Sequence, residues 1–350
     1  MLNTKWGAHV SEPEESAHFP RLAKPGTSRR DFLCLAGAAL MGTPKTNEAA
    51  PRPPAPEGKS RVVISRDPQL RRPGAGVDSG RLLKLVDRAL QAFYDRDNAL
   101  EAWQRVARPG EVVGLKVNCL AGRGISTTVT LVEAIAERLQ QAGVRDIVIW
   151  DRLNSDLESA RFRVNEKGPG VRCFGNDTLG YEGELATFGS VGSLLARTLT
   201  QVCDAVINLP VLKDHGITGV TLALKNLFGA IHNPNKYHLT VGDPYVADVN
   251  MLPAIRQKIR LTICDATTAQ YEGGPSFMPQ WTWLYNGLLV ARDPVALDST
   301  GWQIIERKRA EKGLKSLKEM KREPAYIATA ADANHRLGTN DPKRIELVEV

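Results

Sequence analysis

The residues best suited to chemistry are concentrated between Cys203 and His238. This stretch contains three of the chain's six histidines and three lysines, namely His215, His232, His238, Lys213, Lys225 and Lys236. Imidazole exchanges protons near neutral pH and binds metals, and lysine binds anions or, when buried, acts as a base. Two interpretations stay open: the histidines share one metal, or a histidine works as a general acid or base. We predict that the catalytic residues are His215, Lys225 and His238.

Lys225 interrupts an apolar segment, Leu222–Phe228, that is rich in helix-forming residues. Burying a lysine is costly unless the ammonium is paired or serves a site. The sequence therefore favours a functional lysine that holds a cofactor or a substrate group, with Asn226 beside it. The alternative is an ordinary surface position on an amphipathic helix.

Polar side chains follow four short apolar runs that are typical of buried strands. These side chains are Lys116 and Asn118, Asp151 and Arg152, Lys213 to His215, and Asp265. Because sites in α/β proteins form at the carboxyl ends of parallel strands, we expect these groups to meet at one sheet edge. The residues predicted to bind a small anion are Lys116, Asn118, Arg152, Lys213 and Asn226. The predicted ligands of a metal are His215, His232, His238 and Asp265.

The elements that must position these residues alternate between strand and helix. Strands are predicted at 61–65, 112–118, 146–150, 205–209, 261–265, 288–291 and 345–350. Helical periodicity is found at 77–100, 128–142, 246–257 and 295–309. A strand–helix–strand order implies right-handed parallel crossovers. We therefore predict an α/β fold with a mainly parallel sheet flanked by helices, in one large domain or two interlocked lobes.

The composition fits a globular protein with a sizeable core, with 42% hydrophobic and 24% charged residues. The net charge is +7, but the basic residues are scattered and form no stripe with interleaved aromatic residues, so no nucleic-acid partner is expected. None of the five cysteines forms a CxxC pair or a ferredoxin-type run. The sequence therefore carries no zinc or iron–sulfur motif.

Residues 1–50 are predicted to be a disordered export leader. Ser28 to Leu33 reads SRRDFL and resembles the S-R-R-x-F-L pattern of twin-arginine signals; the small and apolar residues after it are too few to span a bilayer. This resemblance implies the twin-arginine translocase as a partner during export, a periplasmic or extracellular location, and no stable membrane anchor. The alternative is a disordered tail with a chance pair of arginines. A Pro-rich linker at 51–59 then leads to an α/β domain at 60–350.

Several segments resemble the uncharacterised family called domain of unknown function 362. They read VGLKVN (113–118), TLVEAIAERLQQAGVRDIVIWD (130–151), DAVINLPVLKDHGITGVTLALKNLFGAIH (204–232), ICDATTAQYEGGPSF (263–277) and ARDPVALDSTG (291–301). Many members of that family carry added ferredoxin-type cysteine runs. This chain lacks them, so the resemblance implies no iron–sulfur cluster here.

The order His215, Lys225, His238 is also similar to the core of the nickel-dependent lactate racemase family. That resemblance implies that Lys225 tethers a metal-containing organic cofactor and that the histidines act as metal ligand or acid and base. The chain departs from that family where Asp151 and Arg152 replace a histidine and where Lys225 lacks a double-glycine context. The cofactor stays unknown, with a divalent metal and a metal-containing organic cofactor as the candidates.

These expectations combine into one leading function. The chain is predicted to be an exported enzyme acting on a small anionic molecule, with proton transfer at carbon, as in racemisation or epimerisation, as the leading reaction. One alternative is a periplasmic binding or redox-accessory protein without turnover. Another is an interaction scaffold.

Overall fold

The central strands of this chain are buried on both faces, and their side chains alternate between two apolar cores. The computed structural model describes residues 58–71, 74 and 76–350; the predicted leader and linker residues 51–57 lie outside this range. In strand β1 (Ser60–Arg66), Val62 and Ile64 enter one core and Val63 the other, because successive side chains of a strand point to opposite faces. Such a sheet requires helices on both of its faces.

One sheet of eleven strands runs through the described residues. Its continuous hydrogen-bonded order is β13 (Ile345–Glu349), β1, β12 (Gly287–Ala291), β10 (Ile259–Gln270), β7 (Ala205–Asn208), β2 (Val112–Lys116), β3 (Asp146–Asp151) and β4 (Val171–Gly175). The strands beside this order are β8 (Val211–His215), β9 (Gly219–Thr221) and β11 (Thr282–Trp283). Pairing is parallel from β10 through β7, β2 and β3 to β4, and antiparallel around β12. A separate hairpin joins β5 (Ala186–Phe188) to β6 (Val191–Ser193).

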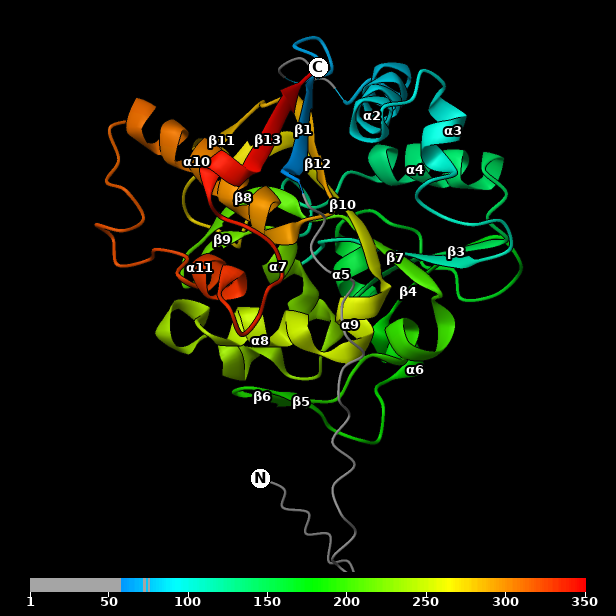
Figure 1. Cartoon of the computed structure of the whole chain (residues 1–350). Helices are drawn as coiled ribbons and strands as arrows, with labels where there is room; N and C mark the ends of the chain where they lie inside the picture. Colours follow the sequence, from blue (N-terminus) through cyan, green and yellow to red (C-terminus); the bar gives the residue numbers. More distant parts are fainter. Residues whose placement is uncertain (1–57, 72–73, 75) are drawn as a thin grey trace, which may run out of the picture. The chain divides into compact units, whose positions relative to one another are not determined.

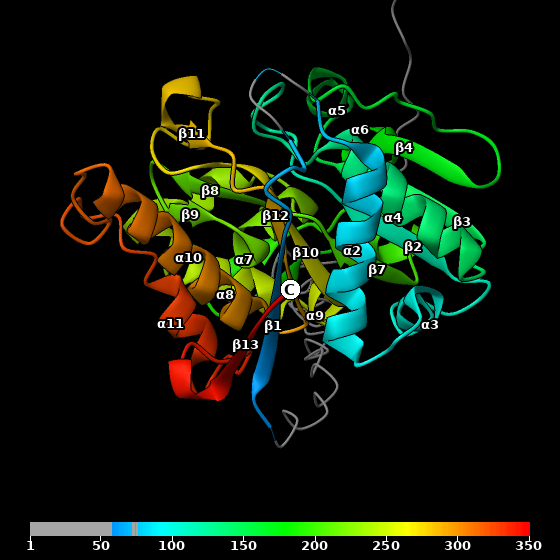
Figure 2. The ribbon, with the colours of Figure 1, turned by 90° about the horizontal axis from the view of Figure 1, so that it is seen from above.

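Helices cover both faces of the sheet (Figures 1 and 2). One face carries α2 (Ser79–Tyr94), α3 (Ala99–Trp103) and α4 (Val129–Gln141). The other carries α7 (Ala223–Asn226), α8 (Tyr245–Met251), α9 (Pro253–Lys258), α10 (Pro294–Glu311) and α11 (Tyr326–Ala331). The shorter helical elements are α5 (Asn154–Ser159), α6 (Asn176–Leu179), η1 (Thr198–Val202), η2 (Leu227–Ala230), η3 (Pro234–Tyr237), η4 (Leu239–Gly242), η5 (Pro279–Trp281) and η6 (Pro342–Arg344). The predicted α/β fold with a mainly parallel, helix-flanked sheet is confirmed.

The order in which the chain adds strands to the sheet reverses at β2. From β2 it adds β3 and β4 on one side, and it then returns to place β7 on the other side of β2. At such a switch point the loops that follow neighbouring strands part and leave a crevice at the carboxyl ends of the strands. Three of the four predicted polar strand ends deliver their side chains to this crevice.

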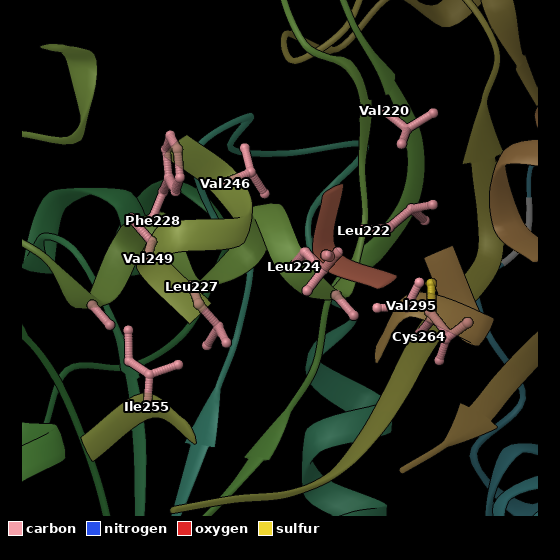
Figure 3. Packing of buried hydrophobic residues seen from close by; sticks show 14 of the residues in the cluster. Val220, Leu222, Leu224, Leu227, Phe228, Val246, Val249, Ile255, Cys264 and Val295 are labelled. Carbon is pink, nitrogen blue, oxygen red and sulfur yellow. The ribbon is translucent and has the colours of Figure 1, made fainter. Parts of the chain in front are cut away.

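The segment carrying Lys225 is anchored by apolar side chains. Leu224, Leu227 and Phe228 are buried in the same core as Val246 and Val249 of α8 (Figure 3). The segment Leu222–Phe228 contains only the four residues of α7 as α-helix, because the chain continues from Leu227 as the 3-10 helix η2. Residues 219–221 before it pair with β8 as strand β9. The short helix fixes the direction in which its lysine leaves the backbone.

Two other predictions differ from the structure. The tripeptide Lys213-Asp214-His215, expected just after a strand, forms the end of strand β8, and all three residues are buried. The predicted helix at 77–100 ends at Tyr94, because Asp95 adopts a left-handed conformation that closes it.

The cysteines and the helices of the described residues add two observations. Cys119, Cys173, Cys203 and Cys264 are free and buried, and burial raises the pKa of the Cys173 and Cys203 thiols to about 12. Within residues 58–71, 74 and 76–350, no helix has the length and apolar character needed to cross a bilayer.

Candidate functional site

A cavity of about 130 Å³ opens at the switch point, at the carboxyl ends of β2, β3 and β8. Its lining contains every residue predicted to be catalytic or anion-binding, namely Lys116, Asn118, Arg152, Lys213, His215, Lys225, Asn226 and His238. The enclosed volume is close to the roughly 150 Å³ of a cavity that accepts benzene. The cavity therefore suits a molecule of only a few carbon atoms.

Lys116 at the end of β2 forms a buried ion pair with Asp151 at the end of β3. Lys116 Nζ lies 2.8 Å from Asp151 Oδ1, and the two side chains are 1% and 8% exposed. The second carboxylate oxygen, Oδ2, accepts a hydrogen bond from the Cys119 backbone N–H at 2.7 Å. The parallel register that pairs Lys116 with Trp150 brings these strand ends together. Lys116 is thus neutralised and helps to fix the floor of the cavity.

Arg152 is held at the rim rather than inside the cavity. Its Nε and Nη2 atoms lie 3.3 and 3.2 Å from Asp156 Oδ2, four residues further along in α5. The arginine side chain is 30% exposed. Arg152 and Lys116 therefore each have an acidic partner, and the charges of these two pairs cancel.

Lys213 enters the cavity from the buried strand β8 and has no acidic partner in the part of the chain that the structure describes. Its Nζ donates to the carbonyl oxygens of Ile125 at 3.2 Å and Pro275 at 3.4 Å. Burial lowers the pKa of this ammonium to about 8. Because an ammonium has three donors, one N–H remains for a bound molecule.

The neighbouring carboxylate, Asp214, points away from the cavity and organises the loop behind it. Its Oδ1 accepts a hydrogen bond from the Gly274 N–H at 2.8 Å, and Arg322 Nη1 lies 3.5 Å from its Oδ2. Burial raises the pKa of this carboxyl to about 6. These contacts fix the loop that presents Pro275 to the cavity and to Lys213.

Lys225 also lacks an acidic partner among the described residues and contacts a histidine instead. Its Nζ lies 3.1 Å from His238 Nε2 and 3.9 Å from the centroid of the Phe228 ring. His238 Nδ1 lies 3.2 Å from the Asn235 carbonyl oxygen, which can only accept, so Nδ1 carries the proton and Nε2 accepts from Lys225. Burial, and next the charge of Lys213, lower the pKa of Lys225 to about 7.

His215 adopts the opposite tautomer. Its Nδ1 accepts hydrogen bonds from the backbone N–H groups of Ile217 at 3.1 Å and Thr218 at 3.2 Å, which places the ring proton on Nε2. Burial, followed by the charge of Lys225, lowers the pKa of His215 to about 2. His215 is therefore a neutral hydrogen-bond donor at physiological pH.

A relay of three asparagines holds α7 against the sheet. Asn118 Nδ2 donates to Asn226 Oδ1 at 3.0 Å, and Asn226 Nδ2 donates to Asn208 Oδ1 at 2.8 Å. Two buried oxygens of the lining, Asn118 Oδ1 and Thr221 Oγ1, have no hydrogen-bond partner within the described part of the chain. Since buried polar atoms are normally satisfied, these two oxygens are expected to meet a ligand or water.

The structure does not gather the four residues predicted to bind one metal. The His232 ring packs edge-on against Tyr181, and Asp265 accepts backbone hydrogen bonds from Thr128 and Thr267, outside the cavity. Among the described residues no group of three His, Cys, Asp or Glu side chains is arranged to hold a metal. The tautomer of His215 also places a proton on Nε2, the nitrogen left for coordination. The residues present therefore do not fit a metal bound by all four.

Sequence reasoning missed parts of this site. The structure adds Thr221, Phe228 and Pro275 to the lining, and Asp298 accepts hydrogen bonds from the backbone at the beginning of α7. Asp151 was expected at this sheet edge but had no assigned role; it is the last residue of β3 and pairs with Lys116. Pro275 had no signal in the sequence, because its loop is held at the cavity by contacts of Asp214 and Gly216 with Gly274, which is distant in sequence.

Asp298 of α10 holds the beginning of the helix that carries Lys225. Its two carboxylate oxygens accept hydrogen bonds from the backbone N–H groups of Ala223 at 2.7 Å and Leu224 at 3.1 Å. Burial raises the pKa of this carboxyl to about 8. A buried side chain thus caps α7, and its position determines where the lysine amine lies.

Comparisons with known proteins show what the chain is similar to. The chain is 30% identical over 254 residues to the thylakoid-associated protein sll1697 of Synechocystis sp., an alignment that covers 69% of this chain and 72% of that protein. A crystal structure of a Thermotoga maritima protein superimposes with a TM-score of 0.39 at 12% identity, covering 69% of this chain and 60% of that one. The resemblance to lactate racemases stays a prediction.

One family description matches the chain over residues 113–303. Every residue that lines the cavity, from Lys116 to Pro275, lies within these bounds. The chain therefore belongs to the family described as domain of unknown function (DUF362).

Proposed function

We propose that this protein is an enzyme that binds a small carboxylate and transfers a proton at one of its carbon atoms, as racemases and epimerases do. The observation that carries the proposal is the contact of Lys225 Nζ with His238 Nε2, 3.1 Å apart. Of the three lysines in the cavity lining, Lys213 and Lys225 have no acidic partner among the described residues. A buried amine beside an imidazole acceptor is a suitable proton-transfer pair. The cavity volume of about 130 Å³ also suits a carboxylate of only a few carbon atoms.

Charge supports the choice of an anion. The pairs Lys116–Asp151 and Arg152–Asp156 cancel, which leaves the ammonium groups of Lys213 and Lys225 uncompensated in the lining. A carboxylate would neutralise them and would accept the remaining N–H of Lys213. Asn118 Oδ1 and Thr221 Oγ1 would contact the polar substituent of the same molecule.

Protonation states support proton transfer. With a pKa of about 7, Lys225 is divided between ammonium and amine near neutral pH, as a general base requires. His238 Nε2 accepts a proton from it, and His215 Nε2–H donates a hydrogen bond to oxygen that gains charge when a C–H bond breaks. The proposed chemistry is carried by the chain's own residues.

The experiment measures binding and proton exchange separately. Two- to four-carbon carboxylates are titrated by calorimetry, and exchange of their carbon-bound hydrogen with D₂O is followed by NMR. Lys213→Met should weaken binding by roughly 30-fold, since a charge-assisted hydrogen bond contributes about 2 kcal/mol. Lys225→Met should slow exchange by about 10²- to 10⁴-fold.

Lys236→Met is the matched control, because Lys236 lies in the same segment but outside the lining. It should behave like the wild type. Binding without exchange would instead identify a binding protein without turnover. Exchange that is unchanged in Lys225→Met would overturn the proposal.

We also propose that the chain is exported by the twin-arginine route, on the basis of its SRRDFL segment. The similar Synechocystis protein is described as thylakoid-associated, which is compatible with a protein that leaves the cytoplasm. Replacing Arg29 and Arg30 by lysine should retain the full-length chain in the cytoplasmic fraction of the native host. Unchanged fractionation of that variant would contradict export by this route.

A further inference from the structure

The amine of Lys225 is placed as a nucleophile as well as a base. The residue is 8% exposed, lines the cavity, and forms no ion pair with the described residues. Its polar contact is with a nitrogen that accepts, His238 Nε2 at 3.1 Å. A lysine held for charge alone would be expected to lie against a carboxylate, as Lys116 does with Asp151.

The surroundings of this amine favour its neutral form. His238 is fixed in the accepting tautomer by the Asn235 carbonyl oxygen, so it can take the proton that Lys225 must lose. Lys213 lines the same cavity and disfavours a second positive charge. Burial next to another cation is an established way of activating a lysine for imine formation.

We propose that Lys225 forms a covalent imine with a small 2-oxo carboxylate. This inference rests on the proposed function and names its substrate class. Lys225 Nζ attacks the carbonyl carbon of the 2-oxo acid, and the carbon–oxygen π bond opens to a carbinolamine. The nitrogen loses its two protons, the former carbonyl oxygen leaves as water, and a C=N bond forms. No oxidant or reductant is consumed.

The remaining lining residues suit this class of substrate. Lys213, with one uncommitted N–H, would hold the carboxylate, and His215 Nε2–H would donate to the oxygen that departs as water. His238 would carry protons between nitrogen and oxygen. The imine nitrogen withdraws electrons from the neighbouring carbon, so a proton at carbon 3 of the acid becomes acidic. Because the nitrogen of Lys225 is bound to carbon in the imine, His238 Nε2 would take the carbon-3 proton in its place. The imine would thereby serve the proton transfer at carbon of the proposed function.

Reductive trapping tests the imine directly. Full-length protein is incubated with pyruvate or 2-oxobutyrate, sodium borohydride is added, and the intact mass and the modified peptide are determined by mass spectrometry. We expect one stable adduct per chain, mapped to Lys225. Lys225→Arg keeps a cation but has no amine that forms an imine, so the adduct should disappear, whereas Lys236→Arg should retain it.

Two further measurements keep the outcomes separate. Circular dichroism and thermal unfolding of Lys225→Arg and Lys225→Met show that loss of the adduct occurs in folded protein. Exchange of carbon-3 hydrogen with D₂O without a trapped adduct, or an adduct on another lysine, would overturn the imine and leave the proposed proton transfer standing. Failure of every tested carboxylate to bind and to exchange would overturn the proposed function itself.

Discussion

The rings of His215 and His238 lie stacked, with 5.6 Å between centroids and 28° between planes, and they are held in opposite tautomers. Backbone N–H groups force the proton of His215 onto Nε2, and a backbone carbonyl holds the proton of His238 on Nδ1. One imidazole therefore donates through Nε2 while the other accepts through Nε2. The pair divides hydrogen-bond donation and proton acceptance between two rings that are both neutral at physiological pH.

The reactivity of Lys225 should rise with pH through about 7. The amine must lose its proton to react, and its pKa is lowered to about 7 by burial and by Lys213. Lys213→Met removes the charge of Lys213, so the pH midpoint of Lys225 labelling should shift upward in that variant. Labelling of Lys225 by a limiting amine reagent, measured by mass spectrometry from pH 5 to 10, checks both expectations. A midpoint near 10.5, the ordinary pKa of lysine, would contradict them.

Lys225→Met should stabilise the fold while it removes activity. The unfolded chain binds a proton at Lys225 below its ordinary pKa of 10.5, whereas the folded chain releases it above about 7. Wild-type stability therefore rises with pH between these values, and burial of the lysine costs most below pH 7. We expect a gain on the order of 1 kcal/mol in urea unfolding at pH 7 that shrinks toward pH 10. Equal stability of the two proteins at every pH would count against a strained, functional lysine.

Asp151→Asn should be strongly destabilising. It leaves the Lys116 ammonium buried without its counter-charge, which typically costs about 3–5 kcal/mol. Asp156→Asn is the matched control, because its partner Arg152 is partly exposed and such pairs contribute about 0–1 kcal/mol. Urea unfolding measures both. Similar losses for the two variants would show that the Lys116–Asp151 pair is not the stronger support.

Gly229→Ala should disturb the same pair by crowding. A Cβ atom at this position would lie 2.7 Å from Lys116 Cε and 3.0 Å from Asp151 Oδ1, so the lysine would have to move. Overpacking of this kind costs about 1–3 kcal/mol. Gly192→Ala is the control, because its nearest contact would be an ordinary 3.6 Å. Thermal unfolding and carboxylate binding should both change in the first variant and remain near wild type in the second.

Asp298→Ala should lower exchange activity without touching the cavity. It removes the acceptor of the Ala223 and Leu224 N–H groups, and the loss of such a cap costs about 2 kcal/mol. Asp293→Ala removes a similar cap from α10, where Asp293 accepts from Val295 and Ala296, away from Lys225. We expect both variants to lose stability but only Asp298→Ala to lose exchange per folded molecule. Equal exchange rates would remove Asp298 from the positioning of Lys225.

The sequence predicted those parts of the site that follow from strand ends and from a lysine in an apolar segment. Lys116, Arg152 and Lys213 were found because polar residues directly follow apolar strands, and parallel strands bring such ends together. Lys225 was predicted to belong to the site because burying an unpaired lysine is costly, and the structure places it in the cavity lining. These arguments need only local pattern and a parallel sheet.

The remaining features depend on contacts between distant segments. His232 and Asp265 were grouped with the other predicted metal ligands by residue type, but the structure uses them for packing and for backbone hydrogen bonds. The tautomers of His215 and His238 depend on loop carbonyls and N–H groups that no sequence pattern specifies. The burial of Asp214 in β8 depends on Gly274 and Arg322, which are distant in the chain.

The switch point between β2 and β7 also has a consequence for how the protein matures. Its cavity takes Lys116, Asp151, Lys213, His238 and Pro275 from segments that are distant in the sequence. Contacts between distant segments form slowly, because loop closure must precede them. Affinity for a small carboxylate should therefore be absent from partly folded chains and appear only in the last phase of refolding. Binding of the carboxylate would then report that the site has folded completely.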